Sequence, residues 1–353
     1  MRTLSTELQA EQEAVSNTPY TRIYVNDTDY SDRLLYNEHH EEAYRDRATV
    51  ILRNDDRALD IATVDLTGKF FRIGYGHITG EAVAEPNGNN DTAEYAYAAP
   101  LWVKNQWVTS MEGIVVCQLY CTGAWAYLRE QRVMAYGSAP YYNFQFNATH
   151  TIYELIEEVV ETAMGWSLAA SPTVDDGILN DFKPIFDVNE MPYENAASVL
   201  YRLISMTKCY LRIKANYGYD YPEVEIVYPQ EADTANENYY DNQGHYFFEY
   251  TEKVNLLIPN SIAVFCNQGE DGTWTTDDII TGTSEDAVEI AKYTEVLQPY
   301  MDGTITNQTD ADNRAAAILT RIKAEQLAGK LIIPHDSSVE LYDKVTVHDA
   351  RGI

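Results

Sequence analysis

The sequence is poor in basic residues. Its 353 residues include 25 Lys and Arg against 55 Asp and Glu, which gives a formal net charge of −30. A nucleic-acid-binding surface needs clustered Lys and Arg to displace the counterions of phosphates, and no such cluster occurs here. Binding to DNA, RNA or an anionic membrane is therefore disfavoured. The acidity by itself predicts little more than solubility.

Cysteine is scarce as well. The four cysteines, Cys117, Cys121, Cys209 and Cys266, have neither a zinc-ribbon nor a redox spacing. Cys117 and Cys121 fall in a predicted strand, where residues four positions apart are separated by about 13 Å, too far for a disulfide. We expect all four to be reduced and mostly buried, as small hydrophobic side chains.

Long hydrophobic runs are missing. No apolar run approaches the length that spans a membrane, so we expect no membrane insertion by this chain. Residues 1–15 lack the apolar stretch of a secretory signal peptide. Without such a signal, the three glycosylation sequons at Asn26, Asn147 and Asn307 carry little meaning.

Motifs for catalysis and cofactor binding are also missing. There is no nucleophile elbow and no P-loop. Residues 40–44, HEEAY, place Tyr44 where a metalloprotease helix needs its second His. Residues 74–80, GYGHITG, have the wrong spacing for a dinucleotide loop and no helix follows them, which favours a strand. We expect no metal, no cofactor and no enzymatic activity.

One acidic segment leaves an alternative open. Residues 271–278, DGTWTTDD, combine three carboxylates with a tryptophan. Carboxylate pairs can drive glycoside hydrolysis, and tryptophan can stack on sugars. A chain with 55 acidic residues also produces such a cluster by chance. We therefore keep a carbohydrate-binding or carbohydrate-active protein as the alternative function.

Aromatic residues are abundant, with 28 Tyr against nine Phe. Tyrosine has a large apolar body with a polar tip, which suits half-buried strands and protein–protein contacts. The density is high between residues 102 and 127. We predict a mixture of core and subunit interface there, with five candidate interface residues: Trp102, Trp107, Tyr120, Trp125 and Tyr127.

Periodicity predicts a mixed α+β protein in which strands dominate. Residues 1–16 are predicted as a short polar helix or arm, 28–46 as a loop or arm, and short aromatic strands follow from Ala48. A helix is predicted from a capping box at Thr151 and Glu154 to Gly165. A second helix starts near residue 192 and feeds a hairpin, and a third spans 310–328 and is capped by Gly329. Their predicted core positions include Leu200 and Leu319.

The order of these segments resembles that of phage tail hub, or baseplate hub, proteins, a family related to the hub part of type VI secretion spike proteins. The resemblance covers most of residues 46–349. It is carried by five segments of the sequence: 48–77, 113–128, 149–166, 181–229 and 311–349. The last of these has a Leu-x-Asp-x-Val pattern at Leu341, Asp343 and Val345.

The resemblance implies two small β-barrel-like domains with an inserted helix–hairpin module. The corresponding division is 1–45 as an N-terminal arm, 46–148 as the first barrel-like domain, 149–232 as the α+β module and 233–353 as the second β domain with its long helix. These domains can be discontinuous. Hubs of this kind usually continue further, so we expect the last domain to be truncated or open after residue 349.

The resemblance also implies a function without catalysis. We expect a structural virion protein of the tail that is assembled in the host cytoplasm. It would form a homotrimeric ring that joins the tail tube to the tip or spike, with the tube, spike or tip and tape-measure proteins as partners. DNA would pass through the ring without being bound, because an acidic wall repels it. A carbohydrate-binding or carbohydrate-active phage protein remains the alternative.

Overall fold

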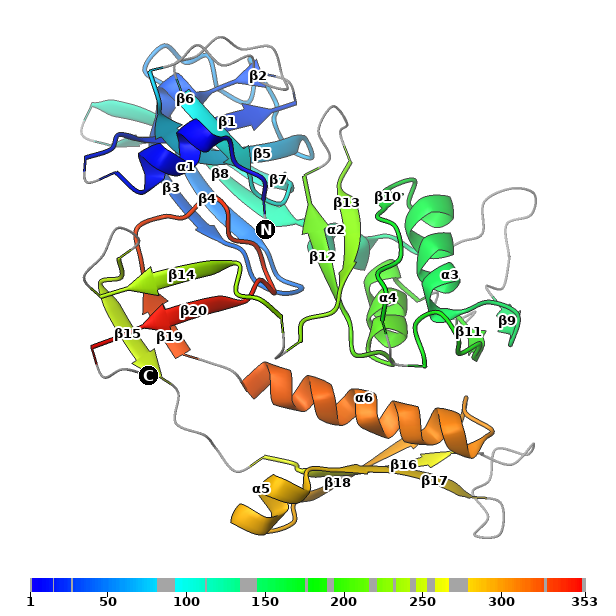
Figure 1. Cartoon of the computed structure of the whole chain (residues 1–353). Coiled ribbons are helices and arrows are strands. Elements are labelled where there is room, and N and C mark those ends of the chain that lie inside the picture. Colours follow the sequence, from blue (N-terminus) through cyan, green and yellow to red (C-terminus); the bar gives the residue numbers. More distant parts are fainter. Residues whose placement is uncertain are drawn as a thin grey trace.

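The computed structural model describes residues 2–14, 16–26, 28–80, 93–111, 113–133, 145–174, 177–188, 194–215, 221–230, 233–241, 246–252, 258–266, 279–326 and 329–350. Figure 1 shows a large sheet from the N-terminal third, a helical module beside it, and a small sheet under a long helix at the opposite end. Strands and helices alternate in short pieces, so the predicted β-dominated α+β class is confirmed.

The large sheet has eight strands. Along its path they lie in the order β2 (Thr28–Asp29), β1 (Pro19–Val25), β5 (Phe70–Ile78), β7 (Leu101–Met111), β8 (Ile114–Gly123), β4 (Arg47–Arg53) and β3 (Leu34–His40), and β6 (Ala93–Tyr97) pairs with β5. The helix α1 (Thr6–Gln12) precedes them and the 3-10 turn η1 (Ser31–Arg33) leads into β3. Residues 28–46, predicted as a loop or arm, therefore contribute two strands. The alternation of apolar and polar residues that predicts a strand is weak in this segment, because β3 is an edge strand and few of its side chains are buried.

This sheet has a core of its own, which we call the sheet core. Side chains alternate across a strand, so every second residue of β4 points inward. The inward residues pack with those of the neighbouring strands, among them Ile23, Val50, Leu52, Phe71 and Leu119. The segment 74–80 lies mostly in β5, as predicted. Gly76 is required there, since a Cβ would sit 1.8 Å from the carbonyl oxygen of Glu94 on β6.

The sheet bends strongly without closing. Tyr75 of β5 has its hydroxyl 3.0 Å from the Asn37 amide nitrogen and 3.1 Å from the His39 Nδ1, both on β3 at the end of the strand path. No backbone pairing joins β3 to β1 or β5 among the described strands. The described part is thus a curved open sheet, and a closed barrel is not observed in it.

The helical module follows the sheet. It contains α2 (Ala124–Glu130), α3 (Ile152–Glu157) with a π-helical turn η2 (Glu158–Ala163), and α4 (Ala196–Ile204). The predicted capping box is confirmed, since the Glu154 N–H donates to Thr151 Oγ1 and the Glu154 carboxylate accepts from the Thr151 N–H. Gly165 follows with φ +67°, a left-handed conformation that favours glycine and ends the helix.

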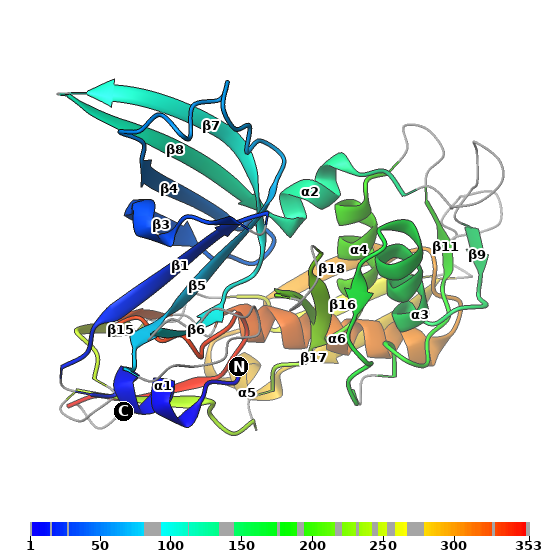
Figure 2. The same ribbon diagram turned by 90° about the horizontal axis from the view of Figure 1, so that it is seen from above.

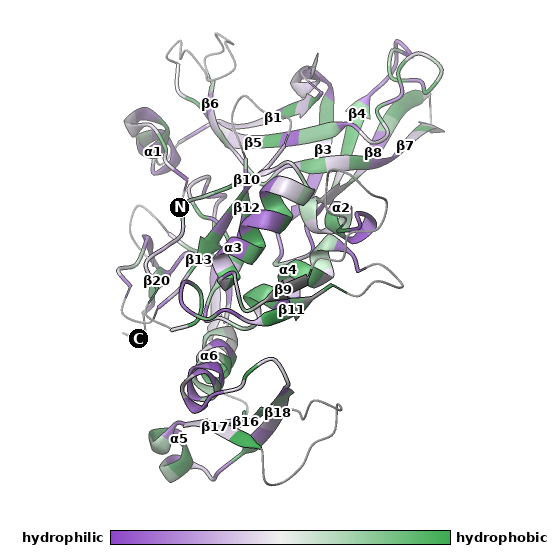
Figure 3. Cartoon of the chain, turned by 90° about the vertical axis from the view of Figure 1, so that its right-hand side faces the viewer, coloured by the Kyte–Doolittle hydropathy of each residue, from purple (hydrophilic) through white to green (hydrophobic). Residues whose placement is uncertain are grey.

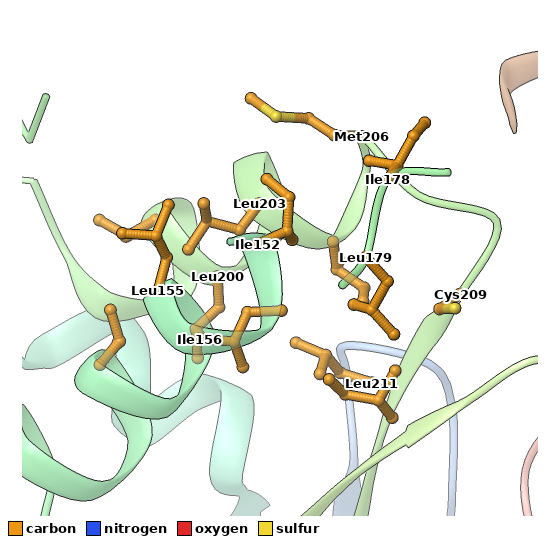
Figure 4. Close-up of a cluster of buried hydrophobic side chains, with 14 of the residues drawn as sticks. Ile152, Leu155, Ile156, Ile178, Leu179, Leu200, Leu203, Met206, Cys209 and Leu211 are labelled. Carbon is orange, nitrogen blue, oxygen red and sulfur yellow. The ribbon is translucent and has the colours of Figure 1, made fainter. Parts of the chain in front are cut away.

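Short strands complete this module. The predicted hairpin is β12 (Tyr210–Lys214) with β13 (Glu223–Val227), and β10 (Ser167–Leu168) pairs with β13 in parallel. The short strands β9 (Gln145–Asn147) and β11 (Ile185–Asp187) pair with each other. The predicted stripe of α4 is buried throughout: Ala196, Val199, Leu200, Leu203 and Ile204. Figure 4 shows Leu200 and Leu203 against Ile152, Leu155 and Ile156 of α3.

The C-terminal third holds three small sheets. β14 (Glu237–Tyr240) pairs with β20 (Val345–His348), and β15 (Glu249–Glu252) pairs with β19 (Gly329–Ile332). β16 (Ser261–Cys266) lies between β17 (Ile280–Glu285) and β18 (Leu297–Asp302), with the short helix α5 (Ala287–Lys292) between the latter two in sequence. The helix α6 (Gln308–Gln326) confirms the third predicted helix, whose expected last residues, 327 and 328, lie outside the described residues, and Gly329 is the first residue of β19.

A second core, the helical core, joins the module to the long helix. Buried residues of α3, α4, β12, β16 and α6 form one cluster, which includes Leu200, Val264 and Leu319. Figure 3 shows the apolar stretches of β4 and β8 in the large sheet, well separated from the small sheet with β16. The sheet core lies before Gly123 and most of the helical core lies after it, with the buried Ala99 as an earlier member of the helical core. The expected boundaries at residues 148 and 232 stay predictions.

Ion pairs hold the chain ends to the rest. Arg2 donates to both carboxylate oxygens of Glu41 at 3.0 Å and to the Val339 carbonyl oxygen at 2.9 Å. Arg212 of β12 donates to Glu225 of β13 and to Asp343, the central residue of the Leu-x-Asp-x-Val pattern. The buried Glu340 carboxylate lies 3.7 Å from each of the two guanidinium groups. The segment 337–343 is therefore fixed between the N-terminal residues and the hairpin.

Candidate assembly surface

A row of side chains with exposed aromatic residues at its two ends crosses four strands of the large sheet. The strand registers place Tyr36 of β3, Ile51 of β4, Gln118 of β8 and Trp107 of β7 side by side. With strands about 4.8 Å apart, the row is about 14 Å long. Trp107 is 45% exposed and Tyr36 is 49% exposed, so the apolar ends of the row face solvent. We call this side of β3, β4, β8 and β7 the outer face.

A β-bulge decides which tryptophans share the outer face. The register of β7 with β8 shifts between Val103 and Asn105, so Lys104 is an extra residue without a cross-strand partner. As a result Trp102 lies opposite Thr122 and Trp107 lies opposite Gln118, two positions of β8 that point to the same side. In a regular strand, two residues five positions apart would point to opposite sides.

The outer face is covered at one end and bare at the other. Trp102 stacks on Tyr127 of α2, with ring centroids 5.0 Å apart, and on Trp166 at 6.0 Å. This aromatic stack belongs to the contact between sheet and helical module. Figure 2 shows the other end, where the β7–β8 hairpin with Trp107 extends beyond its neighbouring strands. A row with two exposed aromatic side chains, one of them on a projecting hairpin, is a surface suited to bind another protein.

The five candidate interface residues thus have different surroundings. Trp125 is 3% exposed and packs edge-to-face against Tyr44 with ring centroids 4.6 Å apart, inside the chain's own core. Trp102 and Tyr127 are half-buried against the helical core. Trp107 and the half-buried Tyr120, which lies opposite Asn105, remain on the open part of the outer face. The interface prediction is therefore retained as a proposal for Trp107 and Tyr120.

Two arginines lie on the same face. Arg47 and Arg53 of β4 alternate with the buried residues of that strand, and they lie opposite Thr122 and Val116 of β8. Arg47 is 3.7 Å from the Glu42 carboxylate. Arg53 is exposed and makes no ion pair with a described residue. Glu38 of β3 also lies on this face, where its carboxylate accepts from the Tyr36 hydroxyl at 3.2 Å. The outer face therefore carries charges of both signs, with the exposed Arg53 guanidinium outside the ion pairs of the described residues.

The failed metal motif begins with His40, the last residue of β3, and continues into the turn that follows, so it does not lie on a helix. His40 is exposed, with its Nε2 3.0 Å from Glu38. His39 points inward, and burial together with the Arg2 charge lowers the pKa of its imidazole to about 4. Asp46 follows at the start of β4, where burial and the nearby Glu41 raise the pKa of its carboxyl group to about 7. Among the described residues, no group of three His, Cys, Asp or Glu side chains is placed to hold a metal ion.

The remaining predicted sites can be placed briefly. All four cysteines are free and buried, as expected, and burial raises the pKa of the Cys117 thiol to about 11. Residues 271–278 lie outside the described part of the chain. A polar hollow of about 430 Å³ lies between the N-terminal segment and β14, lined by Arg2, Gln12 and Asn236 among others. None of the described helices is long and apolar enough to cross a membrane.

Comparison with solved structures identifies the fold. The chain matches a tail protein from Neisseria meningitidis MC58 with a TM-score of 0.58 and 10% identity, covering 95% of this chain and 87% of the other. It matches the 43 kDa tail protein of prophage MuSo2 from Shewanella oneidensis with a TM-score of 0.59 and 11% identity, covering 94% and 88%. The chain has a phage tail protein fold.

A third solved structure agrees with this assignment. The prophage tail protein gp18 from Listeria monocytogenes EGD-e matches with a TM-score of 0.53 and 10% identity, covering 96% of this chain and 87% of the other. No protein-family model and no curated protein sequence matches the chain. The tail-protein fold thus extends over nearly the whole chain at an identity too low for sequence matching. The resemblance to phage tail proteins predicted from segment order is confirmed at the level of the fold.

Proposed function

We propose that the chain is a structural component of a phage tail, a baseplate hub that forms a ring between the tail tube and the tip or spike. The observation that carries the proposal is the match of nearly the whole chain, helical module included, to three tail proteins. The exposed row from Tyr36 to Trp107 supports it, because a ring subunit needs a surface for its neighbour.

The finer features of the proposal follow from the same resemblance. The curved sheet, with Tyr75 of β5 reaching Asn37 and His39 of β3, supports a barrel-like first domain. The small sheets of the C-terminal third would supply its counterpart. The ring would be a homotrimer in the virion, assembled in the host cytoplasm with tube, spike or tip and tape-measure proteins. It would have no enzymatic activity.

The mass of the particle in solution tests this proposal. We expect a species of three chains, about three times 40.1 kDa, at micromolar concentration by mass photometry or light scattering. Electron microscopy of the same sample should show a threefold ring with a pore. A sharp monomer that does not assemble even with the neighbouring tail proteins would contradict the hub function.

Passage of DNA gives a second test. A conduit should not hold its cargo, and Lys or Arg on its wall would bind phosphates by releasing counterions. The charge of −30 per chain supports an acidic lining. At physiological salt, electrostatic repulsion extends about 8 Å, which is comparable to the clearance around a threaded duplex. We expect no measurable duplex binding at moderate salt. Micromolar affinity that weakens with salt would refute the conduit role and leave the structural role standing.

A further inference from the structure

A second apolar surface lies on the small sheet of β16, β17 and β18. The helix α6 covers one side of this sheet, because a Cβ on Gly282 would meet the Ala311 carbonyl of α6 at 2.1 Å. Ile262, Val264 and Cys266 of β16 point to that side and belong to the helical core. Strand alternation then turns Leu297, Pro299 and Met301 of β18 to the opposite side, which we call the free face.

The free face is apolar along β18, whereas Thr281, Thr283 and Glu285 of β17 contribute polar side chains to it. Leu297 is 55% exposed and Met301 is 71% exposed. Phe265 of the central strand lies beside Met301 and points to the same side. Large side chains of this kind in one row, on a strand at the edge of a sheet, mark a protein-binding surface.

The charges around the free face are acidic. Glu285 of β17 aligns with Ser261, which aligns with Leu297, so its carboxylate shares the face with the apolar row. Glu295, which precedes β18, is exposed as well. Neither carboxylate forms an ion pair with a described cation. The free face therefore combines an apolar row with two carboxylates outside the described ion pairs, whereas the outer face offers the Arg53 guanidinium beside its own apolar row.

The two faces lie too far apart to meet within one chain. Figures 1 and 3 both show the large sheet and the small sheet at opposite ends of the molecule. Two different complementary patches produce a head-to-tail contact between copies, and such contacts close into a ring when the rotation between copies allows it. We propose that the outer face of one copy docks on the free face of the next copy. The proposal rests on the ring-forming function proposed above.

Two single substitutions test the two faces separately. Trp107→Asp places a charge in the outer face, and Met301→Asp places one in the free face. Both side chains are exposed, so each variant should fold with an unchanged circular dichroism spectrum. We expect each variant to lose the ring at micromolar concentration and to become monomeric. Phe248→Asp is the matched control, because Phe248 is an exposed aromatic residue outside both faces, and it should keep the ring.

Mixing the two variants distinguishes head-to-tail contact from other arrangements. The Trp107→Asp chain keeps an intact free face, and the Met301→Asp chain keeps an intact outer face. One contact can therefore form between the two chains, and no further copy can be added. We expect native mass spectrometry of an equimolar mixture to show a 1:1 heterodimer that neither variant forms alone.

Each other result overturns the inference. A ring that survives either substitution shows that the substituted face is not part of the contact. A mixture that stays monomeric shows that the two faces do not meet, and loss of the ring in the Phe248→Asp control shows that the effect is not specific to the faces. In these three cases the wild-type ring remains and the hub function stands. A wild-type chain that is monomeric overturns the inference. In that case, binding of a different tail protein to the free face would identify that protein as the partner of this surface.

Discussion

The buried charge of Arg212 offers a stringent test of how the chain ends are held. Its guanidinium is 9% exposed and lies between two carboxylates that are also buried, Glu340 at 5% and Asp343 at 6% exposed. It donates to Asp343 at 2.9 Å and to the Leu341 carbonyl oxygen at 3.1 Å. The substitution Arg212→Met keeps most of the volume and removes the charge and every donor.

The expected loss is large because the buried Asp343 carboxylate would lose the Arg212 guanidinium, and the buried Glu340 carboxylate would lose one of the two guanidinium groups that lie 3.7 Å from it. Removing one partner of a buried ion pair costs about 3–5 kcal/mol, most of it from the charge left behind. An exposed pair is worth far less, about 0–1 kcal/mol. Arg57, which is 65% exposed and 2.7 Å from Asp60, therefore provides the matched control as Arg57→Met.

Urea unfolding followed by tryptophan fluorescence measures these losses. Trp125 and Trp166 belong to the helical core, so their emission reports the unfolding of the part that Arg212 supports. A triple variant, Arg212→Met with Glu340→Gln and Asp343→Asn, also removes the two buried carboxylate charges that face Arg212. It should recover at least half of the free energy of unfolding that Arg212→Met loses. The reasoning is refuted if Arg212→Met costs under about 1 kcal/mol, or if the triple variant is no more stable than the single one.

Three further outcomes are expected. Leu200→Ala and Leu319→Ala, both in the helical core, should each destabilise the chain by about 2–5 kcal/mol in the same assay, while Val288→Ala on the exposed side of α5 should change it by under about 0.5 kcal/mol. Burial raises the pKa of Asp46 to about 7. The contribution of the protonated carboxyl group to folding stability is therefore fully present below about pH 4, and it is lost as the pH rises through 7. Asp46→Asn should therefore gain up to about 4 kcal/mol on the wild type between pH 4 and pH 8. Elemental analysis should find no stoichiometric zinc.

Local signals in the sequence predicted the helices well. The capping box at Thr151 and Glu154, the stop at Gly165 and the stripe with Leu200 each depend on residues within a few positions of one another. The predicted hairpin leading from α4 is also confirmed. Such features form wherever the local pattern is strong, so a single sequence suffices to find them.

Edge strands and core boundaries were not accessible in the same way. β3 has polar and exposed side chains, because only one of its sides meets another strand, and its sequence therefore resembled a loop. The helical core joins Leu155 to Leu319 across more than a hundred residues, so no local composition shift marks its extent. Arg212 and Asp343 are likewise distant in sequence, and only the fold brings them together.

The assembly surface was found from sequence only in part, and one residue explains why. Aromatic density predicted an interface among five residues but could not tell which of them are exposed and which are buried. The side of the sheet that a residue faces depends on strand register, which the density does not reveal. Lys104 is the extra residue of the bulge in β7, and it turns Trp107 to the same side as Trp102. Without that bulge, regular alternation would point Trp107 toward the sheet core, beside Cys117 and Leu119. The bulge between the two tryptophans therefore places Trp107 on the solvent-exposed side of the sheet, where another protein can contact it.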